Sequence, residues 1–249
     1  MGRLQGKVAI ITGAASGFGE GMAYRFAEEG ARIVVADINT RGGERVAKKI
    51  GDAAVCVQTD VSQASEFDEL LDVTMKAFGR VDIMVNNAGF THRNGDMLAV
   101  AEHDFDMITA VNMKAIYHAA RKVVPVMEKQ GGGVILTTSS MDGIRPRAGL
   151  TWYNASKGWE ITATRSMALE LAPKNIRVNC ICPAAGETGM LTQLMGGDTP
   201  EAREKFLAAV PLGRFSTPLD VANAALWLVS DEAAMVTGVA LEVDGGSSI

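Results

Sequence analysis

The sequence is poor in cysteine, and its three cysteines form neither a CxxC pair nor a metal-ligand spacing. They are Cys56, Cys180 and Cys182, an odd number that indicates no disulfide framework and favours a reducing, cytoplasmic location. Cys180 and Cys182 alternate along an expected strand, which predicts two small buried side chains on one side of it. The three histidines also form no metal pattern, so we expect no metal site.

The sequence also lacks long apolar runs and an excess of positive charge. No apolar run reaches the roughly 18 residues that indicate a membrane span. The first residues run straight into an expected strand without a signal-peptide core, so we expect neither a membrane association nor export. A net charge of -5 without a basic stripe argues against a nucleic-acid partner.

Short β-branched runs alternate with helical patterns along all 249 residues, 47% of which are hydrophobic. Strands are expected at Val8–Ile11, Arg32–Ala36, Val55–Gln58, Ile83–Val85, Val134–Thr138, Ile176–Ile181 and Ala240–Val243. Helices are expected at about 18–29, 41–50, 64–78, 101–129, 152–172, 200–209 and 218–229. Strands that are apolar on both faces predict a parallel sheet covered by helices on both sides. The fold class is therefore α/β: one doubly wound domain, residues 1–249, with about seven strands.

Two segments carry further expectations about the organisation of the chain. Residues 184–200 are the least regular part, rich in Gly, Thr and Met, and a loop of that length is typical of a lid over a site. We place the half that binds a cofactor at about 1–110 and the half that binds substrate and carries catalysis at about 111–249.

A glycine-rich turn follows the first expected strand. Gly13, Gly17 and Gly19 stand between that strand and the next helix. Glycines at this place permit a tight turn and let backbone N–H groups approach a pyrophosphate at the helix N-terminus. A glycine turn alone can be only a turn, but the order strand, turn, helix favours a dinucleotide site of the Rossmann type.

Asp37 ends the second expected strand, about 20 residues beyond the glycine turn, where a ribose-binding acid is expected. Its carboxylate would accept from the ribose 2′-hydroxyl and repel a 2′-phosphate. Neither Ser16 in the turn nor Ile38 after the acid supplies an arginine to hold such a phosphate. The sequence therefore predicts NAD(H) rather than NADP(H), although Asp37 has the alternative interpretation of an ordinary turn residue.

Two further strand ends carry residues suited to a nucleotide. Asp60 and Val61 follow the third strand, where the carboxylate could accept from an adenine amino group and the valine could pack beside it. Asn87, Ala88 and Gly89 follow the fourth strand, and the two small residues let the chain pass close under a cofactor. Each group alone is compatible with turn chemistry.

Tyr153 and Lys157 are four residues apart in an expected helix, so they share one face about one turn apart. A fixed cation beside a tyrosine favours the phenolate and lowers a pKa that is ordinarily near 10. Such a tyrosine can exchange a proton with an alcohol or carbonyl oxygen. Taken alone, the spacing is also compatible with an aromatic side chain packed under a lysine stem.

Together these residues resemble the short-chain dehydrogenase/reductase family over nearly the whole chain. The motifs that carry the resemblance are Thr12-Gly13-x-x-x-Gly17-x-Gly19, Asp37, Asp60, Asn86-Asn87-Ala88-Gly89, Asn112, Ser140, Tyr153-x-x-x-Lys157, Pro183, Thr188 and Thr237 to Gly246. Near relatives by this resemblance are 3-oxoacyl-carrier-protein reductases and NAD-dependent sugar, polyol or hydroxy-acid dehydrogenases.

The resemblance implies a catalytic tetrad. Tyr153 would be the acid/base, and Lys157 would lower its pKa and bind the nicotinamide ribose. Ser140 would orient the substrate oxygen; neighbouring Ser139 competes for this role, but the family's spacing to the tyrosine favours Ser140. Asn112 would hold a water that links Lys157 to solvent.

The resemblance also implies the remaining cofactor contacts and an oligomer. Besides Tyr153 and Lys157, the implied cofactor residues are Gly13, Ser16, Gly17, Phe18, Gly19, Asp37, Ile38, Asp60, Val61, Asn87, Ala88, Gly89, Pro183, Gly186 and Thr188. The loop after Pro183 departs from the family's usual Pro-Gly-x-hydrophobic-x-Thr, because Ala184 replaces the glycine and Gly186 replaces a hydrophobic residue. The family also suggests a homotetramer.

Residues near these motifs are candidates for substrate contact. They are His92, Arg93, Asp142, Arg145, Arg147, Trp152 and Glu187. The arginines suggest a cationic mouth for an anionic small molecule, with solvated surface charge as the alternative for each.

The expected function is NAD(H)-dependent oxidation of a secondary alcohol, either a sugar, a polyol or a hydroxy acid. A 3-oxoacyl-carrier-protein reductase is the alternative, with Lys129 and Lys174 as contacts for an acidic partner. A non-catalytic cofactor-binding scaffold is the third hypothesis, and the presence of the whole tetrad argues against it.

Overall fold

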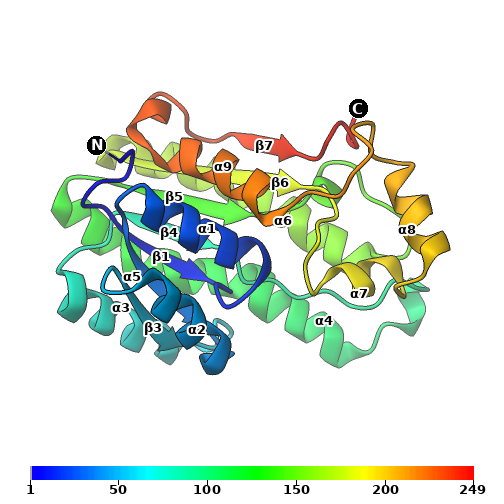
Figure 1. Cartoon of the computed structure of the whole chain (residues 1–249), viewed down its shortest axis with the longest axis horizontal. Helices are drawn as coiled ribbons and strands as arrows, with labels where there is room; N and C mark the ends of the chain where they lie inside the picture. Colours follow the sequence, from blue (N-terminus) through cyan, green and yellow to red (C-terminus); the bar gives the residue numbers. More distant parts are fainter. Residues whose placement is uncertain (1) are drawn as a thin grey trace.

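Seven strands form a single sheet at the centre of the molecule (Figure 1), in the order β3-β2-β1-β4-β5-β6-β7. The strands are β1 (Val8–Thr12), β2 (Arg32–Asp37), β3 (Ala54–Gln58), β4 (Ile83–Asn86), β5 (Gly133–Thr138), β6 (Ile176–Pro183) and β7 (Ala240–Val243). This is a computed structural model that describes residues 2–249, and every strand pair in its sheet is parallel. The predicted seven-stranded parallel sheet is confirmed.

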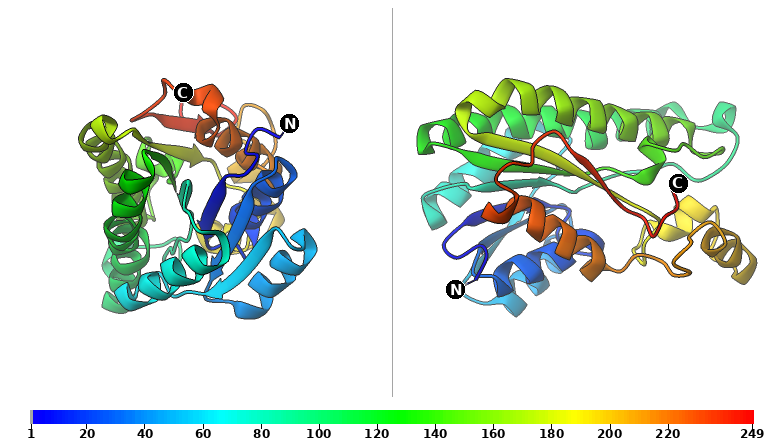
Figure 2. Two further views of the ribbon diagram at one scale, coloured as in Figure 1. Left: turned by 90° about the vertical axis from the view of Figure 1, so that its left-hand side faces the viewer. Right: turned by 90° about the horizontal axis from the view of Figure 1, so that it is seen from above.

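Helices cover both faces of this sheet, as Figure 2 shows. They are α1 (Gly17–Glu28), α2 (Thr40–Ile50), α3 (Ala64–Phe78), α4 (Glu102–Ile108), α5 (Ala115–Gln130), α6 (Thr151–Leu171), α7 (Leu191–Met195), α8 (Pro200–Leu207) and α9 (Pro218–Val229). The core on one face includes residues of α1, α2 and α9, and the core on the other includes residues of α3, α5 and α6. None of the helices in residues 2–249 has the length and apolar character that a membrane crossing requires.

The strands are apolar throughout because successive side chains enter two different cores. In β1, Ile10 belongs to the core under α3, α5 and α6, whereas Ile11 belongs to the core under α1, α2 and α9. Val34 and Val35 of β2 divide in the same way. A strand covered on both faces has no polar face, which is why alternation of polar and apolar residues is absent from the sequence.

Two segments differ from the sequence-based expectation. The single helix expected over 101–129 is divided into α4, a π-helical turn named η2 (Thr109–Lys114) and α5. A π turn holds an extra residue per turn and leaves no signature in hydrophobic periodicity. The irregular segment 184–200 contains α7, whose Leu191 and Leu194 are buried. A five-residue helix is too short for a periodic pattern to reveal.

The order of the strands reverses at the centre of the sheet. β1 has β2 on one side and β4 on the other. From β1 the sheet extends through β2 to β3 in one direction and through β4 to β7 in the other. Parallel strands end at a common edge, and ligands of such sheets bind at that edge beside the point of reversal. The turns after β1 and β4 therefore meet where a ligand site is expected.

Asp82, in the loop before β4, connects three strands at the opposite edge. Its Oδ2 accepts from the N–H of Val8 at 2.9 Å, and its own N–H donates to the Val8 carbonyl at 2.9 Å. Its carbonyl accepts from the N–H of Val134 at 2.8 Å. Arg80 forms a two-pronged ion pair with the same carboxylate, at 2.7 and 2.8 Å.

We expect Asp82→Ala to lower the free energy of unfolding by about 2 kcal/mol, because it leaves the buried Val8 N–H without an acceptor. Arg80→Ala is the matched control: it removes a half-exposed partner and should cost less than about 1 kcal/mol. Urea denaturation of both variants measures the difference. Equal losses in the two variants would show that the ion pair, not the strand connection, matters.

Candidate active site

A cavity of about 490 Å³ lies at the carboxyl edge of the sheet. Every residue predicted to contact a cofactor lines it, apart from Gly19. These residues are Gly13, Ser16, Gly17, Phe18, Asp37, Ile38, Asp60, Val61, Asn87, Ala88, Gly89, Tyr153, Lys157, Pro183, Gly186 and Thr188. Ser140 also lines it. The ends of six strands, together with α1 and α6, thus form one site.

The glycine turn has a backbone conformation and close approaches that favour glycine. Gly13 and Gly17 have φ of 64° and 57°, in the left-handed region that disfavours side chains. A Cβ on Gly19 would lie 2.3 Å from the Gly13 carbonyl oxygen, so Gly19 lets α1 pack against the turn rather than lining the cavity. Ser16 caps α1 without a side-chain hydrogen bond, which leaves N–H groups at the helix N-terminus for an anionic ligand.

Asp37 is held in place by the backbone at the end of β2. Its two carboxylate oxygens accept from the N–H groups of Ala15 and Asn39, each at 2.8 Å. Arg45 of α2 reaches the same region and donates to the Ala15 carbonyl, a contact that the sequence analysis did not foresee. Its guanidinium pairs with Glu20 at 2.6 and 2.8 Å, so its charge is already compensated.

Thr12, at the end of β1, connects the glycine turn to the turn after β4. Its hydroxyl accepts from the N–H groups of Asn87 and Ala88 at 3.0 and 3.1 Å and donates to Val85. The Asn87 amide in return donates to the carbonyls of Thr12 and Gly13. These bonds fix the small residues Ala88 and Gly89 along the cavity wall.

Asn112 lies in the π turn η2 and is buried. Its Oδ1 accepts from the N–H of Phe90 at 2.8 Å, while its Nδ2 donates to the Phe90 carbonyl and to Ser156 Oγ at 3.0 and 2.9 Å. The side chain thereby joins the turn after β4 to α6. Asn112 has no direct hydrogen bond to Lys157.

Tyr153 begins the first turn of α6 and is buried beside Ser140. Burial raises the pKa of Tyr153 and outweighs the opposing effect of Lys157, whose Nζ lies 5.6 Å from the centre of the phenol ring. The net direction is opposite to the one expected from Lys157 alone. Ser140 Oγ accepts from the Asp142 N–H at 3.1 Å, which leaves its own O–H available.

Lys157 has a partner that the sequence analysis missed. Its Nζ donates to both carboxylate oxygens of Glu160, at 2.9 and 3.1 Å, and to the Thr138 carbonyl at 3.1 Å. The side chains of Lys157 and Glu160 are only 5% and 2% exposed. The spacing from Lys157 to Glu160, i to i+3 on a helix, was the signal that could have identified this pair.

Of the residues predicted to face substrate, Asp142 and Arg147 line the cavity. They form a two-pronged ion pair at 2.7 and 2.8 Å, and the guanidinium also lies 4.6 Å from the ring centre of Phe206 in α8. The cavity wall beside Tyr153 is apolar. It is formed by Phe90, Met190 and Leu194, and Met107 and Val111 also line the cavity.

The other candidates for substrate contact do not line this cavity. Arg93 donates to the Gly196 carbonyl, and Arg145 to the carbonyls of Ser247 and Ile249. His92 is buried with its Nδ1 against the Arg93 carbonyl, and Trp152 donates to the Met97 carbonyl. Two arginines of the expected cationic mouth thus hold backbone carbonyls in place.

The loop after β6 is held by the backbone despite its unusual sequence. Ala185 and Glu187 exchange backbone hydrogen bonds with Ser216, and Gly186 forms a β-bridge with the same residue. A Cβ on Gly186 would lie 2.3 Å from the Phe18 ring, so glycine is required at this close approach.

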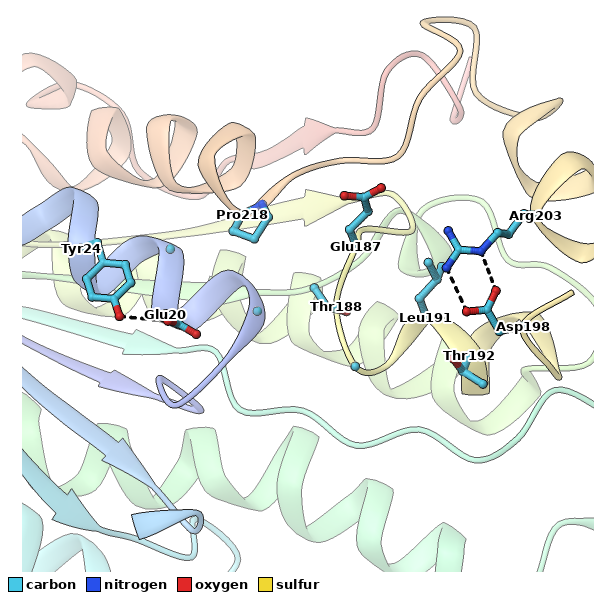
Figure 3. Close-up of a pocket in the computed structure, with 12 residues that line it drawn as sticks. Glu20, Tyr24, Glu187, Thr188, Leu191, Thr192, Asp198, Arg203 and Pro218 are labelled. Atoms are coloured by element: carbon cyan, nitrogen blue, oxygen red, sulfur yellow. Dashed lines mark hydrogen bonds and ion pairs between the residues drawn. The ribbon is translucent and has the colours of Figure 1, made fainter. Parts of the chain in front are cut away.

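A second cavity of about 520 Å³ adjoins the first and shares Gly17, Thr188 and Gly189 with it. Figure 3 shows Glu20 and Tyr24 of α1 on one side of this cavity and Asp198 with Arg203 on the other. Both pairs are internally hydrogen-bonded. Glu187 lines this second cavity. Neither it nor any other part of residues 2–249 contains a cluster of acidic, histidine and cysteine side chains suited to a metal ion.

Comparison with known proteins agrees with this geometry. A family model described as enoyl-(acyl carrier protein) reductase matches residues 13–248. A 4-formylbenzenesulfonate dehydrogenase of Comamonas testosteroni is 44% identical, over 99% of both chains. The chain belongs to the short-chain dehydrogenase/reductase family. Within this family it is an oxidoreductase that acts on alcohol or ketone substrates.

Solved structures of this family share the whole fold. A 3-ketoacyl-(acyl-carrier-protein) reductase from Brucella melitensis, complexed with NADH, is 47% identical with a TM-score of 0.94, and the match covers 99% of this chain and 100% of that one. A 7α-hydroxysteroid dehydrogenase complexed with NADH and 7-oxo glycochenodeoxycholic acid is 40% identical with a TM-score of 0.92, covering 98% and 95%. These NADH complexes support binding of a nicotinamide dinucleotide by this chain.

We expect Thr12→Val to lower the free energy of unfolding by roughly 2 kcal/mol, because valine keeps the shape but leaves the N–H groups of Asn87 and Ala88 without their acceptor. Thr162→Val, an exposed threonine on α6, is the matched control and should change stability little. Guanidinium denaturation of both variants tests this. A Thr12→Val protein as stable as the control would mean that water replaces the hydroxyl.

Proposed function

We propose that this protein is an NAD(H)-dependent oxidoreductase that interconverts a secondary alcohol and a ketone, with Tyr153 as the acid/base. The observation that carries the proposal is that Ser140, Tyr153 and Lys157 line the same cavity as Asp37 and the glycine turn. We further propose one domain over residues 1–249, with the cofactor half at about 1–110 and the catalytic half at about 111–249.

In this proposal Tyr153 passes a proton to or from the substrate oxygen. The nicotinamide, when bound, accepts or supplies the hydride. Ser140 donates its free O–H to the same substrate oxygen and so orients it. Lys157 stabilises the phenolate, and Asn112 fixes the turn after β4 against α6 through its three hydrogen bonds.

The choice of NAD(H) over NADP(H) rests on Asp37. Its carboxylate lines the cavity, and the two backbone N–H groups that hold it leave further lone pairs for a ribose hydroxyl. Arg45 is the cation nearest the glycine turn among the contacts described above, and Glu20 already pairs with it in two places. A 2′-phosphate would therefore meet the Asp37 carboxylate, and Arg45 could balance its charge only by giving up its bonds to Glu20.

The substrate we propose is a small molecule with an apolar, ring-bearing body. The wall beside Tyr153 is formed by phenylalanine, methionine and leucine side chains, which suit such a body better than a sugar or polyol. The names of two relatives, a formylbenzenesulfonate and a hydroxysteroid dehydrogenase, agree with this class. Arg147 also lines the cavity, but Asp142 already pairs with its guanidinium in two places, so it favours an uncharged body over an anionic substituent.

A 3-oxoacyl-carrier-protein reductase remains the alternative, because proteins so named from Thermotoga maritima and Brucella melitensis are 41% and 47% identical to this chain. The expected acidic-partner contacts do not support it. Lys129 and Lys174 precede β5 and β6, so they lie at the edge opposite the cavity, and Lys174 pairs with Glu128.

A homotetramer is proposed from the family resemblance. Tyr117 of α5 and Trp159 and Leu169 of α6 are exposed apolar side chains on the helices expected at one interface, which supports it. A cytoplasmic location stays a prediction from the sequence.

Tyr153→Phe tests the proposed chemistry directly. We expect kcat/KM for alcohol oxidation to fall by roughly 10²- to 10⁴-fold, because the phenol is the proton acceptor. Tyr117→Phe, an exposed tyrosine, is the control and should keep full activity. The assay covers ring-bearing secondary alcohols, sugars, polyols, hydroxy acids and an acetoacetyl thioester. Unchanged turnover in Tyr153→Phe would show that Tyr153 is not the acid/base, whereas a wild type without turnover on any of these substrates would favour the non-catalytic scaffold.

Asp37→Asn tests the choice of cofactor. Removing the charge while keeping the shape should lower the ratio of kcat/KM with NAD⁺ to that with NADP⁺ by about 10- to 100-fold. Asp52→Asn, an exposed aspartate after α2, should leave the ratio unchanged. A wild type that already prefers NADP⁺ would overturn the assignment.

A further inference from the structure

The buried carboxylate of Glu160 has no role in the chemistry described above. It lies on α6 almost one turn beyond Lys157, and its side chain is 2% exposed. An ionised carboxylate is costly to bury unless a charge or several hydrogen bonds compensate it. Here both oxygens accept from one ammonium, which supplies the compensating charge.

This pairing determines where the ammonium of Lys157 lies. An ammonium group has three N–H donors. The Thr138 carbonyl takes one at 3.1 Å, and the two oxygens of Glu160 lie at 2.9 and 3.1 Å. Nζ is thereby held between the end of β5 and the face of α6, 5.6 Å from the centre of the Tyr153 ring.

The groups that surround the pair come from every adjoining element. On α6 the group is Tyr153, which feels the charges of both Lys157 and Glu160, whereas Arg165 is exposed and acts on Cys180. The segment after β5 contributes Ser139, Ser140 and the Asp142–Arg147 ion pair. β6 contributes the thiols of Cys180 and Cys182, and β7 contributes Ala240, which is apolar. Lys157 is the only cation hydrogen-bonded to Glu160 among the residues that the structure describes.

The charge on Glu160 can change in the neutral range, whereas that on Lys157 does not. Burial raises the pKa of Glu160 to about 7, against the opposing attraction of Lys157. Burial alone would lower the pKa of Lys157, but Glu160 and Tyr153 reverse the direction and the net pKa is raised. The ammonium therefore stays charged while its partner gains or loses a proton.

Glu160 also acts on Tyr153 over a longer distance. The ionised carboxylate raises the pKa of Tyr153, whereas Lys157 lowers it. When Glu160 is ionised it therefore offsets part of the stabilisation that Lys157 gives the phenolate. When Glu160 is neutral, Lys157 acts on Tyr153 without that opposing charge.

We propose that Glu160 is a positioning residue that fixes the ammonium of Lys157 and moderates its effect on the proton affinity of Tyr153. The inference rests on the proposed function, in which Tyr153 exchanges a proton with the substrate oxygen. It assigns a role to a side chain that neither touches substrate nor lines the cavity.

The first experiment measures kcat/KM for alcohol oxidation against pH. Glu160→Gln keeps the size and an acceptor oxygen but removes the charge, so the phenolate becomes easier to form. The rising limb of the profile should shift to lower pH by about one pH unit. Glu170→Gln, an exposed glutamate on the same helix, is the control and should leave the profile in place. Glu160→Asp, which keeps the charge, should return the limb toward its wild-type position.

The second experiment needs no substrate. The folded state raises the pKa of Glu160 from 4.5 to about 7, so between these values the folded protein holds a proton that the unfolded chain has released. This contribution to stability is present below pH 4.5 and is lost as the pH rises to about 7. The melting temperature of Glu160→Gln, relative to wild type, should therefore rise across that range.

The outcomes separate the inference from the proposed function. An active wild type whose profile coincides with that of Glu160→Gln would overturn the inference and leave the function intact. A wild type inactive on every alcohol would overturn the function, while the melting experiment still tests the Lys157–Glu160 pair. Glu160→Met provides an apolar second variant. If neither variant folds, Glu160 is a structural requirement and the inference is wrong.

Discussion

The common direction of the seven strands is the constraint on which the site depends. Because all strands are parallel, every strand begins at one edge of the sheet and ends at the opposite edge. The turns that follow the strands therefore all lie at that second edge. Gly13, Asp37, Asn87, Ser140 and Pro183 are far apart in the sequence yet line one cavity for this reason. The covering helices then add Tyr153 and Lys157 from α6, so the residues proposed to bind the cofactor and the residue proposed as acid/base share one enclosure.

Buried hydrogen bonds give this enclosure a fixed shape. The Thr12 hydroxyl and the Asn87 amide join the turns after β1 and β4, and Asn112 joins the turn after β4 to α6. Asn112 reaches both partners from a π turn. Its side chain therefore points in a different direction from the one it would have in a regular α-helix. Unpaired polar groups are expensive inside a protein, so each of these residues is constrained by the partners it must satisfy.

The sequence predicted the strands to within two residues at each end, because strands covered on both faces are continuous apolar runs. The π turn and α7 were not predicted, because neither is long enough to produce a recognisable period of hydrophobic residues in the sequence. Motifs whose chemistry depends on the backbone, such as the glycine turn and the turn after β4, led to residues that line the cavity. Long charged side chains were harder to place. Arg93 and Arg145 hold carbonyls elsewhere, because the reach of an arginine allows many partners and its sequence position does not choose among them.

Tyr153 illustrates why a two-residue motif does not determine a proton affinity. Lys157 lowers the pKa of this phenol, but burial, Asp142 and Glu160 all act in the other direction. Near Tyr153 two cations, Lys157 and Arg147, are each paired with a buried carboxylate, so these four groups carry no net charge when all of them are ionised. In a balanced arrangement of this kind the potential at the phenol depends on which charge is nearest rather than on their sum. Burial therefore sets the direction of the pKa shift of Tyr153, and the geometry of the Lys157–Glu160 pair, rather than the presence of the lysine alone, adjusts how readily Tyr153 gives up its proton.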